Sequence, residues 1–472
     1  MGFIEQLGVL DSVVVVIMMA GLIFVSIFFT KNNKSAEEYN NAGKSLTIWL
    51  VVGSTIATFM GSYSGLGAPQ LILAAGLSGL TAGLMFHVGW IALCFMAKPL
   101  RASGVNTLSE FLAVKYGGQS TRTVGAIVTV VFVFSSIAGQ FIACGTMAQV
   151  LGISTLRDGI IYGGLMIILL SMFGGLKGVA ITNTIQSVFI AIVCVIAIPV
   201  MSFVKAGGFM TVMNDIKTTS PQTLNFFAGM APMTLIGYVL SNLLSAGSSP
   251  SYTQRILVAK DVKTGVRGSI ISNLLGVCFT IPIALGVLCV PYILPNVTDG
   301  SHYMPQMILT FFPPVLKGIA VFSFASLFLT TGDANLMLAS SVVANDLIKV
   351  AKPDIDDRKL YHISRISVVV IGLISIAVAV NSGTIYEIMM LGSAVYGAAI
   401  FIPLFLGCFF SKNRTYNYKF VNAGMLCGCF VTLIWNWLLV GVTGIAGVIV
   451  GALACLFLCL AGSKKITGKE TQ

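Results

Sequence analysis

Two adjacent threonines, Thr330 and Thr331, lie inside a long apolar stretch and are followed by Asp333. At helical spacing, Leu327, Thr330 and Thr331 fall at positions i, i+3 and i+4, so they share one face of a helix. Two hydroxyls and a main-chain carbonyl are neutral oxygens of the kind that can coordinate Na⁺. The alternative is that both hydroxyls donate to carbonyls of their own helix, as threonines in membrane helices often do.

Two other apolar stretches are interrupted by glycine, serine and proline. They read "STIATFMGSYSGLGAPQ" (54–70) and "SNLLSAGSSPSYTQR" (241–255). A helix in lipid can leave regular geometry only where it is buried in protein or lines a cavity. Paired broken helices in two halves of a chain indicate a transporter binding site. We therefore expect carbonyls of Ala57 and Met60 to face the Leu327, Thr330 and Thr331 oxygens. The alternative is a pair of proline kinks without function.

The composition shows which solvent surrounds these elements. Of the 472 residues, 56% are hydrophobic and 9% are charged, and the mean hydropathy is +0.95, whereas a soluble domain carries about 25% charge. The apolar runs are continuous rather than alternating, which predicts an all-α membrane protein. About thirteen spans of membrane-crossing length are expected, and they cover 9–30, 47–74, 79–98, 122–149, 158–175, 178–204, 231–250, 266–293, 316–347, 361–381, 384–411, 418–440 and 443–462.

Lysine and arginine separate into alternate loops when the chain is divided this way. Only Arg157, Lys205, Lys217 and Lys317 fall on one side, and the other basic residues fall on the opposite side. The positive-inside rule then places the N-terminus outside and the C-terminus in the cytoplasm, in a multi-pass protein of the cell membrane. The net charge of +11 reflects this bias and contact with anionic lipid heads, not a nucleic acid partner. A monomer or a loose oligomer is expected.

Four stretches resemble, in order along the chain, motifs of the sodium:solute symporter family. They are "NTLSEFLAVKYG" (106–117), "FGGLKGVAITNTIQ" (173–186), "PSYTQRILVAKDVKTG" (250–265) and "TTGDANLMLASSVVANDLIK" (330–349). This family includes proline, pantothenate, sialic acid and sodium–glucose transporters. The resemblance implies a LeuT-type inverted repeat of five plus five helices in a single transmembrane domain. The repeats would cover 47–204 and 231–411, with an extra helix at 9–30, two C-terminal helices in 418–462 and a short cytoplasmic tail at 463–472.

The resemblance also implies a sodium site and one departure from the family pattern. The family's site falls on the carbonyls of Ala57, Met60 and Leu327 and the hydroxyls of Thr330 and Thr331. An aspartate that assists sodium in relatives is replaced here by Asn183, which implies one Na⁺ per cycle and leaves proton coupling open. An aspartate that proline-transporter relatives place beside the broken-helix carbonyls is Phe59 in this chain.

Polar and aromatic residues near the two breaks are the candidates for binding a solute. Ordinary helix packing is the alternative for each of them: Ser62, Tyr63, Ser64, His87, Gln140, Asn242, Ser245 and Tyr396. The third predicted span carries no Lys or Arg at mid-depth, which favours a small neutral or zwitterionic solute, such as an amino acid-like or pantothenate-like compound.

These features together predict a secondary active transporter that takes up a small organic solute with Na⁺ by alternating access. No HExxH motif and no GxxxxGK[ST] phosphate loop occurs in the sequence, so neither a zinc enzyme nor a nucleotide-driven pump is expected. No cofactor is expected, and Na⁺ acts only as the coupling ion. The alternatives are a proton-coupled symporter of the same fold and a membrane sensor that binds solute without transport.

Overall fold

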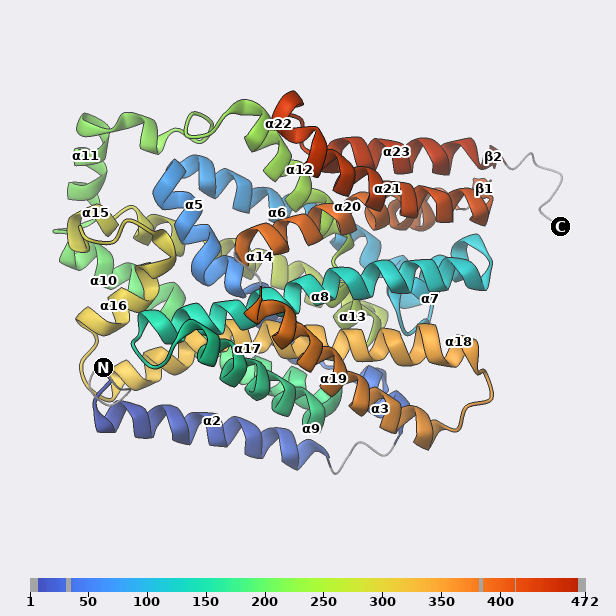
Figure 1. Ribbon diagram of the computed structural model, residues 1–472, viewed down its shortest axis with the longest axis horizontal. Helices are drawn as coiled ribbons and strands as arrows, with labels where there is room; N and C mark the ends of the chain where they lie inside the picture. The colour runs from blue at the N-terminus through green and yellow to red at the C-terminus, as the bar shows by residue number, and fades with distance from the viewer. Residues whose placement is uncertain (1–6, 31–34, 382–384, 412, 466–472) are drawn as a thin grey trace.

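The computed structural model describes residues 7–30, 35–381, 385–411 and 413–465, and most of them are helical. The long helices lie roughly parallel along the longest axis of the molecule (Figure 1). They are α2 (Val9–Thr30), α6 (Leu77–Ala102), α8 (Gln119–Val150), α9 (Leu156–Ile190), α14 (Val262–Val287), α17 (Leu316–Val342), α19 (Asp357–Val380), α20 (Ile385–Phe409) and α21 (Tyr418–Leu438). This arrangement is the all-α bundle that the continuous apolar runs predict.

Shorter elements complete the bundle and its ends. The shorter helices within the bundle are α4 (Ile48–Phe59), α5 (Ala68–Ala75), α10 (Ile198–Lys205), α12 (Pro232–Ser248), α13 (Pro250–Leu257) and α23 (Gly447–Ala461). The connecting helices are α3 (Ala36–Asn41), α7 (Leu108–Tyr116), α11 (Phe209–Thr219), α15 (Val290–Ile293), α16 (Tyr303–Phe311), α18 (Lys349–Ala351) and α22 (Val440–Thr443). Short 3₁₀ turns are η1 (Ala42–Lys44), η4 (Pro221–Leu224) and η5 (Gly300–His302), and π-helical turns are η2 (Tyr63–Gly67), η3 (Ala191–Ala197) and η6 (Val343–Ile348).

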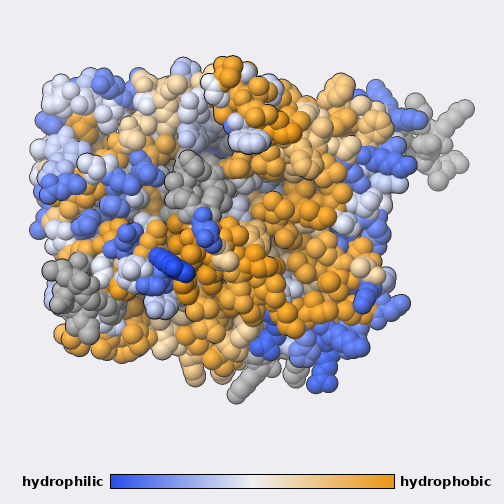
Figure 2. Space-filling view, viewed as in Figure 1, coloured by the Kyte–Doolittle hydropathy of each residue, from blue (hydrophilic) through white to orange (hydrophobic). Residues whose placement is uncertain are grey.

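The surface carries the apolar belt of a membrane protein. Figure 2 shows hydrophobic side chains over the middle of the molecule and hydrophilic ones gathered at its two ends. In the described part of the chain, nine helical runs are long and apolar enough to cross a membrane. The chain is therefore an integral membrane protein whose helices run between the two polar ends.

In the described part of the chain, nine long apolar runs and two shorter apolar helices are consistent with, but do not confirm, the count of thirteen predicted spans. Two of them, 158–175 and 178–204, form one continuous helical run of 50 residues, Leu156–Lys205. This run bends at Gly175, whose φ of 57° is one that a residue without a side chain adopts easily. A two-stranded antiparallel sheet of β1 (Arg414–Tyr416) and β2 (Ser463–Lys465) was not predicted. Strand β2 occupies the first residues of the expected tail, and residues 466–472 lie outside the described residues.

Helix α17 is the centre of the bundle. In the most apolar 18-residue segment of the run Leu316–Ala351, 94% of the residues are buried, whereas in the corresponding segment of α2 only 11% are buried. Helix α17 packs on α2, α4, α8, α9 and α19. A helix enclosed on all sides can hold polar side chains only where neighbouring helices satisfy them. The hydrogen-bond partners of its threonines, Asp333 and Asn335 are therefore expected on those neighbours.

Candidate functional site

The first break separates α4 from the π-helical turn η2. Helix α4 ends at Phe59, and Met60 takes the non-helical angles φ −78° and ψ 72°. Regular geometry resumes at Tyr63. The last carbonyls of a helix have no partner within that helix, so the carbonyls of Ala57 and Thr58 must be satisfied from outside α4.

The threonine pair of α17 lies against these carbonyls. The Thr330 hydroxyl is 2.9 Å from the Ala57 carbonyl oxygen, and the Thr331 hydroxyl is 2.9 Å from that of Thr58. Each hydroxyl also contacts the carbonyl four residues earlier on its own helix, Ser326 at 2.7 Å for Thr330 and Leu327 at 3.2 Å for Thr331. Both interpretations of the pair are therefore present in the geometry, since each hydroxyl faces its own helix and the broken one.

The two threonine hydroxyls have fewer hydrogens to donate than they have carbonyl oxygens in contact. A threonine hydroxyl has one hydrogen to donate, yet each of these two oxygens lies within hydrogen-bond distance of carbonyls from two helices. With one hydrogen each, Thr331 leaves one oxygen–oxygen contact without a proton, and Thr330, which also lies 3.5 Å from the Leu327 carbonyl, leaves two. A cluster of buried oxygens with too few hydrogens is a suitable environment for a small cation.

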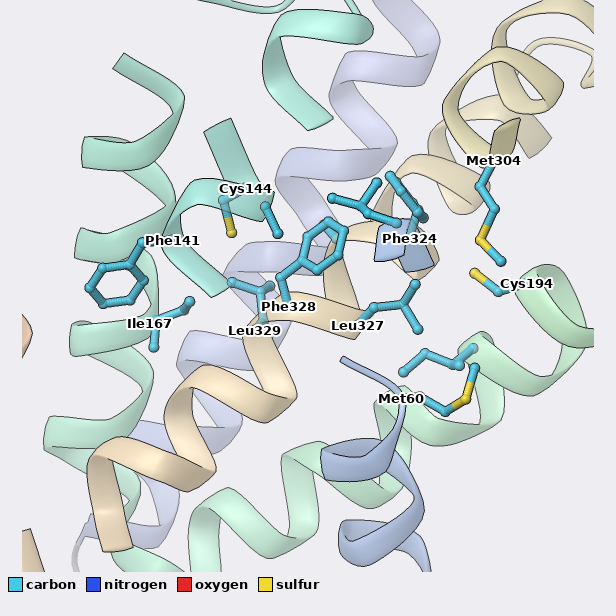
Figure 3. Close-up of a cluster of buried hydrophobic side chains, with 14 of the residues drawn as sticks. Met60, Phe141, Cys144, Ile167, Cys194, Met304, Phe324, Leu327, Phe328 and Leu329 are labelled. Carbon is cyan, nitrogen blue, oxygen red and sulfur yellow. The ribbon is translucent and has the colours of Figure 1, made fainter. Parts of the chain in front are cut away.

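Four of the five predicted sodium residues meet directly, and the fifth lies beside them. Ala57, Leu327, Thr330 and Thr331 share the contacts described above. In the described part of the chain, the Met60 carbonyl is not among the groups that these hydroxyls contact. Figure 3 shows Met60 and Leu327 in one packed apolar cluster with Phe324 and Phe328. Thr58, which the sequence interpretation did not include, contributes the carbonyl that faces Thr331.

Asn183 and Asp333 form a polar contact one turn further along α17. The Asn183 amide, on α9, donates to the Thr330 carbonyl at 3.0 Å and to Oδ1 of Asp333 at 3.1 Å. Asp333 is completely buried. Among the described residues, Oδ2 of Asp333 and Oδ1 of Asn183 have no hydrogen-bond partner. Asp333 therefore pairs with a neighbouring helix next to the threonines.

A cavity of about 140 Å³ opens beside the first break. Its lining comes from both breaks and from α6, α8, α14, α17 and α20, and it includes no acidic, basic or histidine side chain among the described residues. Six predicted solute-binding residues line it: Ser62, Tyr63, Ser64, Gln140, Asn242 and Ser245. Small-molecule sites are concave and mostly apolar with a few fixed polar groups, so this cavity is the candidate solute site.

The other two predicted solute residues, His87 and Tyr396, lie outside the cavity lining. The His87 ring nitrogens are satisfied by side chains of α14, with Nδ1 3.0 Å from Oδ1 of Asn273 and Nε2 3.1 Å from the Thr280 hydroxyl. Tyr396 is buried behind Phe132, a lining residue, with ring centroids 4.6 Å apart. Both residues therefore lie directly behind the cavity wall, because Thr280 and Phe132, which they contact, are lining residues.

Gln140 holds the first break from the side of α8. Its Oε1 accepts from the Ser62 backbone amide at 2.9 Å, and its Nε2 donates to the Ser62 hydroxyl at 2.9 Å. The Gln140 side chain is completely buried. A two-point contact of this kind fixes where the chain leaves α4 and re-enters η2.

The second break is held by residues that the sequence interpretation missed. Helix α12 ends at Ser248 and α13 begins at Pro250. Oδ1 of Asn335 accepts from the Ser251 hydroxyl at 2.5 Å, and Nδ2 of Asn335 donates to the Ser136 hydroxyl at 2.8 Å. All three line the cavity. Their signal in the sequence was the spacing of Asn335 four residues after Thr331, on the same helix face.

An aromatic wall forms another side of the cavity. Phe59, Phe86 and Tyr252 line it, with ring centroids 5.7 Å apart for Phe59 and Phe86 and 6.1 Å apart for Phe86 and Tyr252. Trp90 stacks behind Tyr252 at 4.5 Å. The Phe59 side chain thus adds to an apolar surface where an aspartate would have added a charge.

Comparisons with known proteins show to which family the sequence is similar. The model of the sodium:solute symporter family matches residues 39–428. The osmoregulated proline transporter OpuE of Bacillus subtilis is 22% identical over 449 residues, covering 89% of this chain and 88% of the relative. The sodium/pantothenate symporter of Haemophilus influenzae is 22% identical over 394 residues, covering 80% of this chain and 81% of the relative.

Solved structures with the same fold are transporters. A Na⁺-coupled sialic acid symporter in a substrate-bound outward-open state superposes with a TM-score of 0.82 at 18% identity, covering 98% of this chain and 99% of that one. MhsT in complex with L-phenylalanine gives a TM-score of 0.55 at 11% identity, covering 87% and 98%. At these identities the likeness shows the fold, and it confirms the LeuT-type architecture expected from the sequence.

Proposed function

Since the chain belongs to the sodium:solute symporter family, we propose that it takes up a small organic solute together with Na⁺ by alternating access. Family membership makes it a sodium-coupled membrane transporter rather than an enzyme. The direction of transport, the solute and the residues that bind each ligand are our proposals. The ion ligands follow from the contacts between the broken helix α4 and helix α17, and the solute class follows from the cavity lining.

The proposed sodium ligands are the carbonyls of Ala57, Met60 and Leu327 and the hydroxyls of Thr330 and Thr331. The observation that carries this assignment is the 2.9 Å approach of both hydroxyls to carbonyls at the end of α4. Sodium at this point satisfies the oxygens that lack protons. Carbonyls of unwound helices holding Na⁺ near the middle of the membrane are a recurrent device in transporters.

Coupling follows from the position of this site next to the cavity. Thr58 and Thr331 belong both to the hydroxyl–carbonyl contacts and to the cavity lining, and Met60, a proposed ligand, also lines the cavity. An ion that draws α4 and α17 together therefore also shapes the wall of the solute site. A ligand shifts an equilibrium between outward-facing and inward-facing states by its difference in affinity for the two, so Na⁺ and solute favour the same closed arrangement.

The proposed solute is small and either neutral or zwitterionic, and it is amino acid-like or pantothenate-like. The uncharged lining supports this class, because a solute with net charge would lose its hydration without a counter-charge in the cavity. The relatives named above carry proline and pantothenate by their descriptions. The aromatic wall provides contact for an apolar part of the solute.

We also propose one Na⁺ per cycle, an outside N-terminus and a cytoplasmic C-terminus, with the two repeats over 47–204 and 231–411. Asn183 carries no charge, which supports the single ion. Proton coupling is the second candidate, and the specific observation in its favour is the buried Asp333 carboxyl beside the threonines, with Oδ2 unpaired among the described residues.

Proteoliposomes containing the purified protein test these proposals. Radiolabelled proline and pantothenate are offered with an inward Na⁺ gradient, an inward K⁺ gradient or a pH gradient, with the membrane potential held constant. We expect accumulation only with Na⁺. Accumulation driven by the pH gradient alone would replace Na⁺ by H⁺ as the coupling ion, and Na⁺-dependent binding without accumulation would make the protein a sensor.

A further inference from the structure

No side chain of the preceding segment caps the start of helix α17. Val315, which precedes it, has φ 72° and ψ −53°, and its side chain accepts no hydrogen bond from the first turn. The first backbone N–H groups of a helix have no partner within it. The carbonyl of Pro313 accepts from the backbone N–H of Lys317 at 2.9 Å, and the remaining donors at the start of this enclosed span need an acceptor from another element.

Asp11 of α2 supplies that acceptor. Its Oδ1 accepts from the backbone N–H of Val315 at 2.7 Å and from that of Gly318 at 3.1 Å. The Asp11 residue is only 2% exposed. A Cβ at position 318 would lie 2.5 Å from the Asp11 carbonyl oxygen, so only glycine allows this approach. A carboxylate at a helix N-terminus satisfies N–H groups and interacts favourably with the helix dipole.

The opposite end of α2 is fastened to a different helix. The Ser26 hydroxyl donates to the Leu170 carbonyl of α9 at 2.8 Å. A Cβ at Gly174 would lie 2.9 Å from the Ser26 hydroxyl oxygen, which again marks a close approach. Figure 1 shows α2 running along the edge of the bundle beside α9 and the start of α17. Helix α2 therefore connects α17 at one end with α9 at the other.

These two connected helices carry the ion contacts. Thr330 and Thr331 are on α17, and Asn183 of α9 donates to the Thr330 carbonyl. The rest of α2 is mostly exposed to lipid, since only 11% of the residues in its most apolar 18-residue segment are buried within the protein. A buried carboxylate on such a helix is costly and points to a function. Thr330 lies about 22 Å along the helix axis from Val315, at 1.5 Å per residue.

We propose that α2 is a brace and that Asp11 is a positioning residue for sodium binding. The Asp11 carboxylate fixes where α17 begins, Ser26 fixes α2 on α9, and the two anchors together set how the threonine hydroxyls lie against the α4 carbonyls. Losing the Asp11 anchor weakens Na⁺ binding while the solute cavity keeps its lining. This inference rests on the proposed sodium-coupled function.

The test compares Asp11→Ala, Asp11→Asn and Ser26→Ala with the control Ser12→Ala, whose hydroxyl donates to the carbonyl of Gly8, the residue directly before α2. The Na⁺ concentration for half-maximal uptake and the solute KM at saturating Na⁺ are measured in proteoliposomes. Removing a charged helix cap should raise the half-maximal Na⁺ concentration of Asp11→Ala roughly two- to tenfold, with a smaller rise for Asp11→Asn. Ser26→Ala should also raise it, whereas solute KM and the control stay within about twofold of wild type.

Thermal unfolding of each purified variant, with and without Na⁺, separates positioning from mere stability. If Asp11→Ala lowers the unfolding temperature but keeps the wild-type Na⁺ dependence, the inference is wrong. Should Asp11→Ala fail to fold, Asp11→Asn and Ser26→Ala decide, and wild-type Na⁺ dependence in both overturns it. Sodium-independent uptake by wild type would instead overturn the proposed function itself, so the two failures are distinguishable.

Discussion

The two broken helices are held in different ways. At the first break, main-chain carbonyls of Ala57 and Thr58 face hydroxyls of α17. At the second break, a side chain, Ser251, bonds to another side chain, Asn335, which in turn bonds to Ser136. The first break thus presents fixed backbone oxygens to α17, with Gln140 holding Ser62 beside them, whereas the contacts at the second break are between side-chain hydroxyl and amide groups that can rotate.

This difference indicates that the two breaks have different roles in transport. Backbone oxygens cannot supply protons, so an arrangement of carbonyls and hydroxyls with too few hydrogens is suited to a cation that stays in place. Hydroxyls and amides both donate and accept, so the contacts at the second break can be exchanged for contacts with a solute or with water. We therefore assign ion binding to the first break and the movable closure of the cavity to the second.

Replacing both hydroxyls at the first break should have the largest effect. We expect Thr330→Ala with Thr331→Ala to raise the Na⁺ concentration for half-maximal uptake by at least about tenfold, because each lost contact of this kind contributes about 1–3 kcal/mol. Na⁺ titration of solute uptake in proteoliposomes measures this. Wild-type Na⁺ dependence in the double variant would show that the hydroxyls serve only their own helix.

Removing the amide that holds the first break should come next. Gln140→Leu leaves the Ser62 backbone N–H without its acceptor in α8, and a buried unpaired donor costs about 1–3 kcal/mol. We expect a roughly tenfold lower uptake rate at saturating Na⁺ and solute. The control is Thr146→Ala, one to two turns along α8, whose hydroxyl donates to the Ile142 carbonyl of its own helix. An equal loss in both variants would mean that α8 is generally sensitive.

Much of this first region was predictable from local sequence. Thr330 and Thr331 are neighbours in the chain, their face is fixed by helical periodicity, and the glycines after Met60 mark the break. The family resemblance then joined the two segments. What could not be predicted is the partner of each hydroxyl, because Thr58 rather than Met60 supplies the carbonyl facing Thr331, and that depends on where α4 ends.

The second region was harder to predict for a physical reason. Ser251 and Asn335 are 84 residues apart, and Asn335 and Ser136 are 199 apart. Single-residue patterns show that a side chain is polar and buried, but they do not show which distant helix satisfies it. His87 illustrates the same limit, because its partners Asn273 and Thr280 are over 180 residues away.

Opening the second break should have an intermediate effect. Asn335→Ala removes two side-chain hydrogen bonds across three helices, each of which contributes about 1 kcal/mol. We expect solute efflux from loaded proteoliposomes to rise severalfold, with the Na⁺ concentration for half-maximal uptake less changed than in the threonine variant. The control is Asn345→Ala, whose amide bonds to Ser341 one turn earlier along the same helical run. If Asn335→Ala instead changed Na⁺ dependence as strongly as the threonine variant, the division between the breaks would be wrong.

Substitution of His87 should have the smallest effect on transport. The His87 ring lies outside the cavity lining, and it bonds to Asn273 and Thr280 of α14. Glutamine keeps a donor and an acceptor at this position, so His87→Gln should leave the solute KM within about twofold while lowering the unfolding temperature by a few degrees. Phe86→Ala, which alters a lining residue, serves as the comparison and should raise the KM more. A larger change in KM for His87→Gln than for Phe86→Ala would return His87 to the solute site and extend that site behind the aromatic wall.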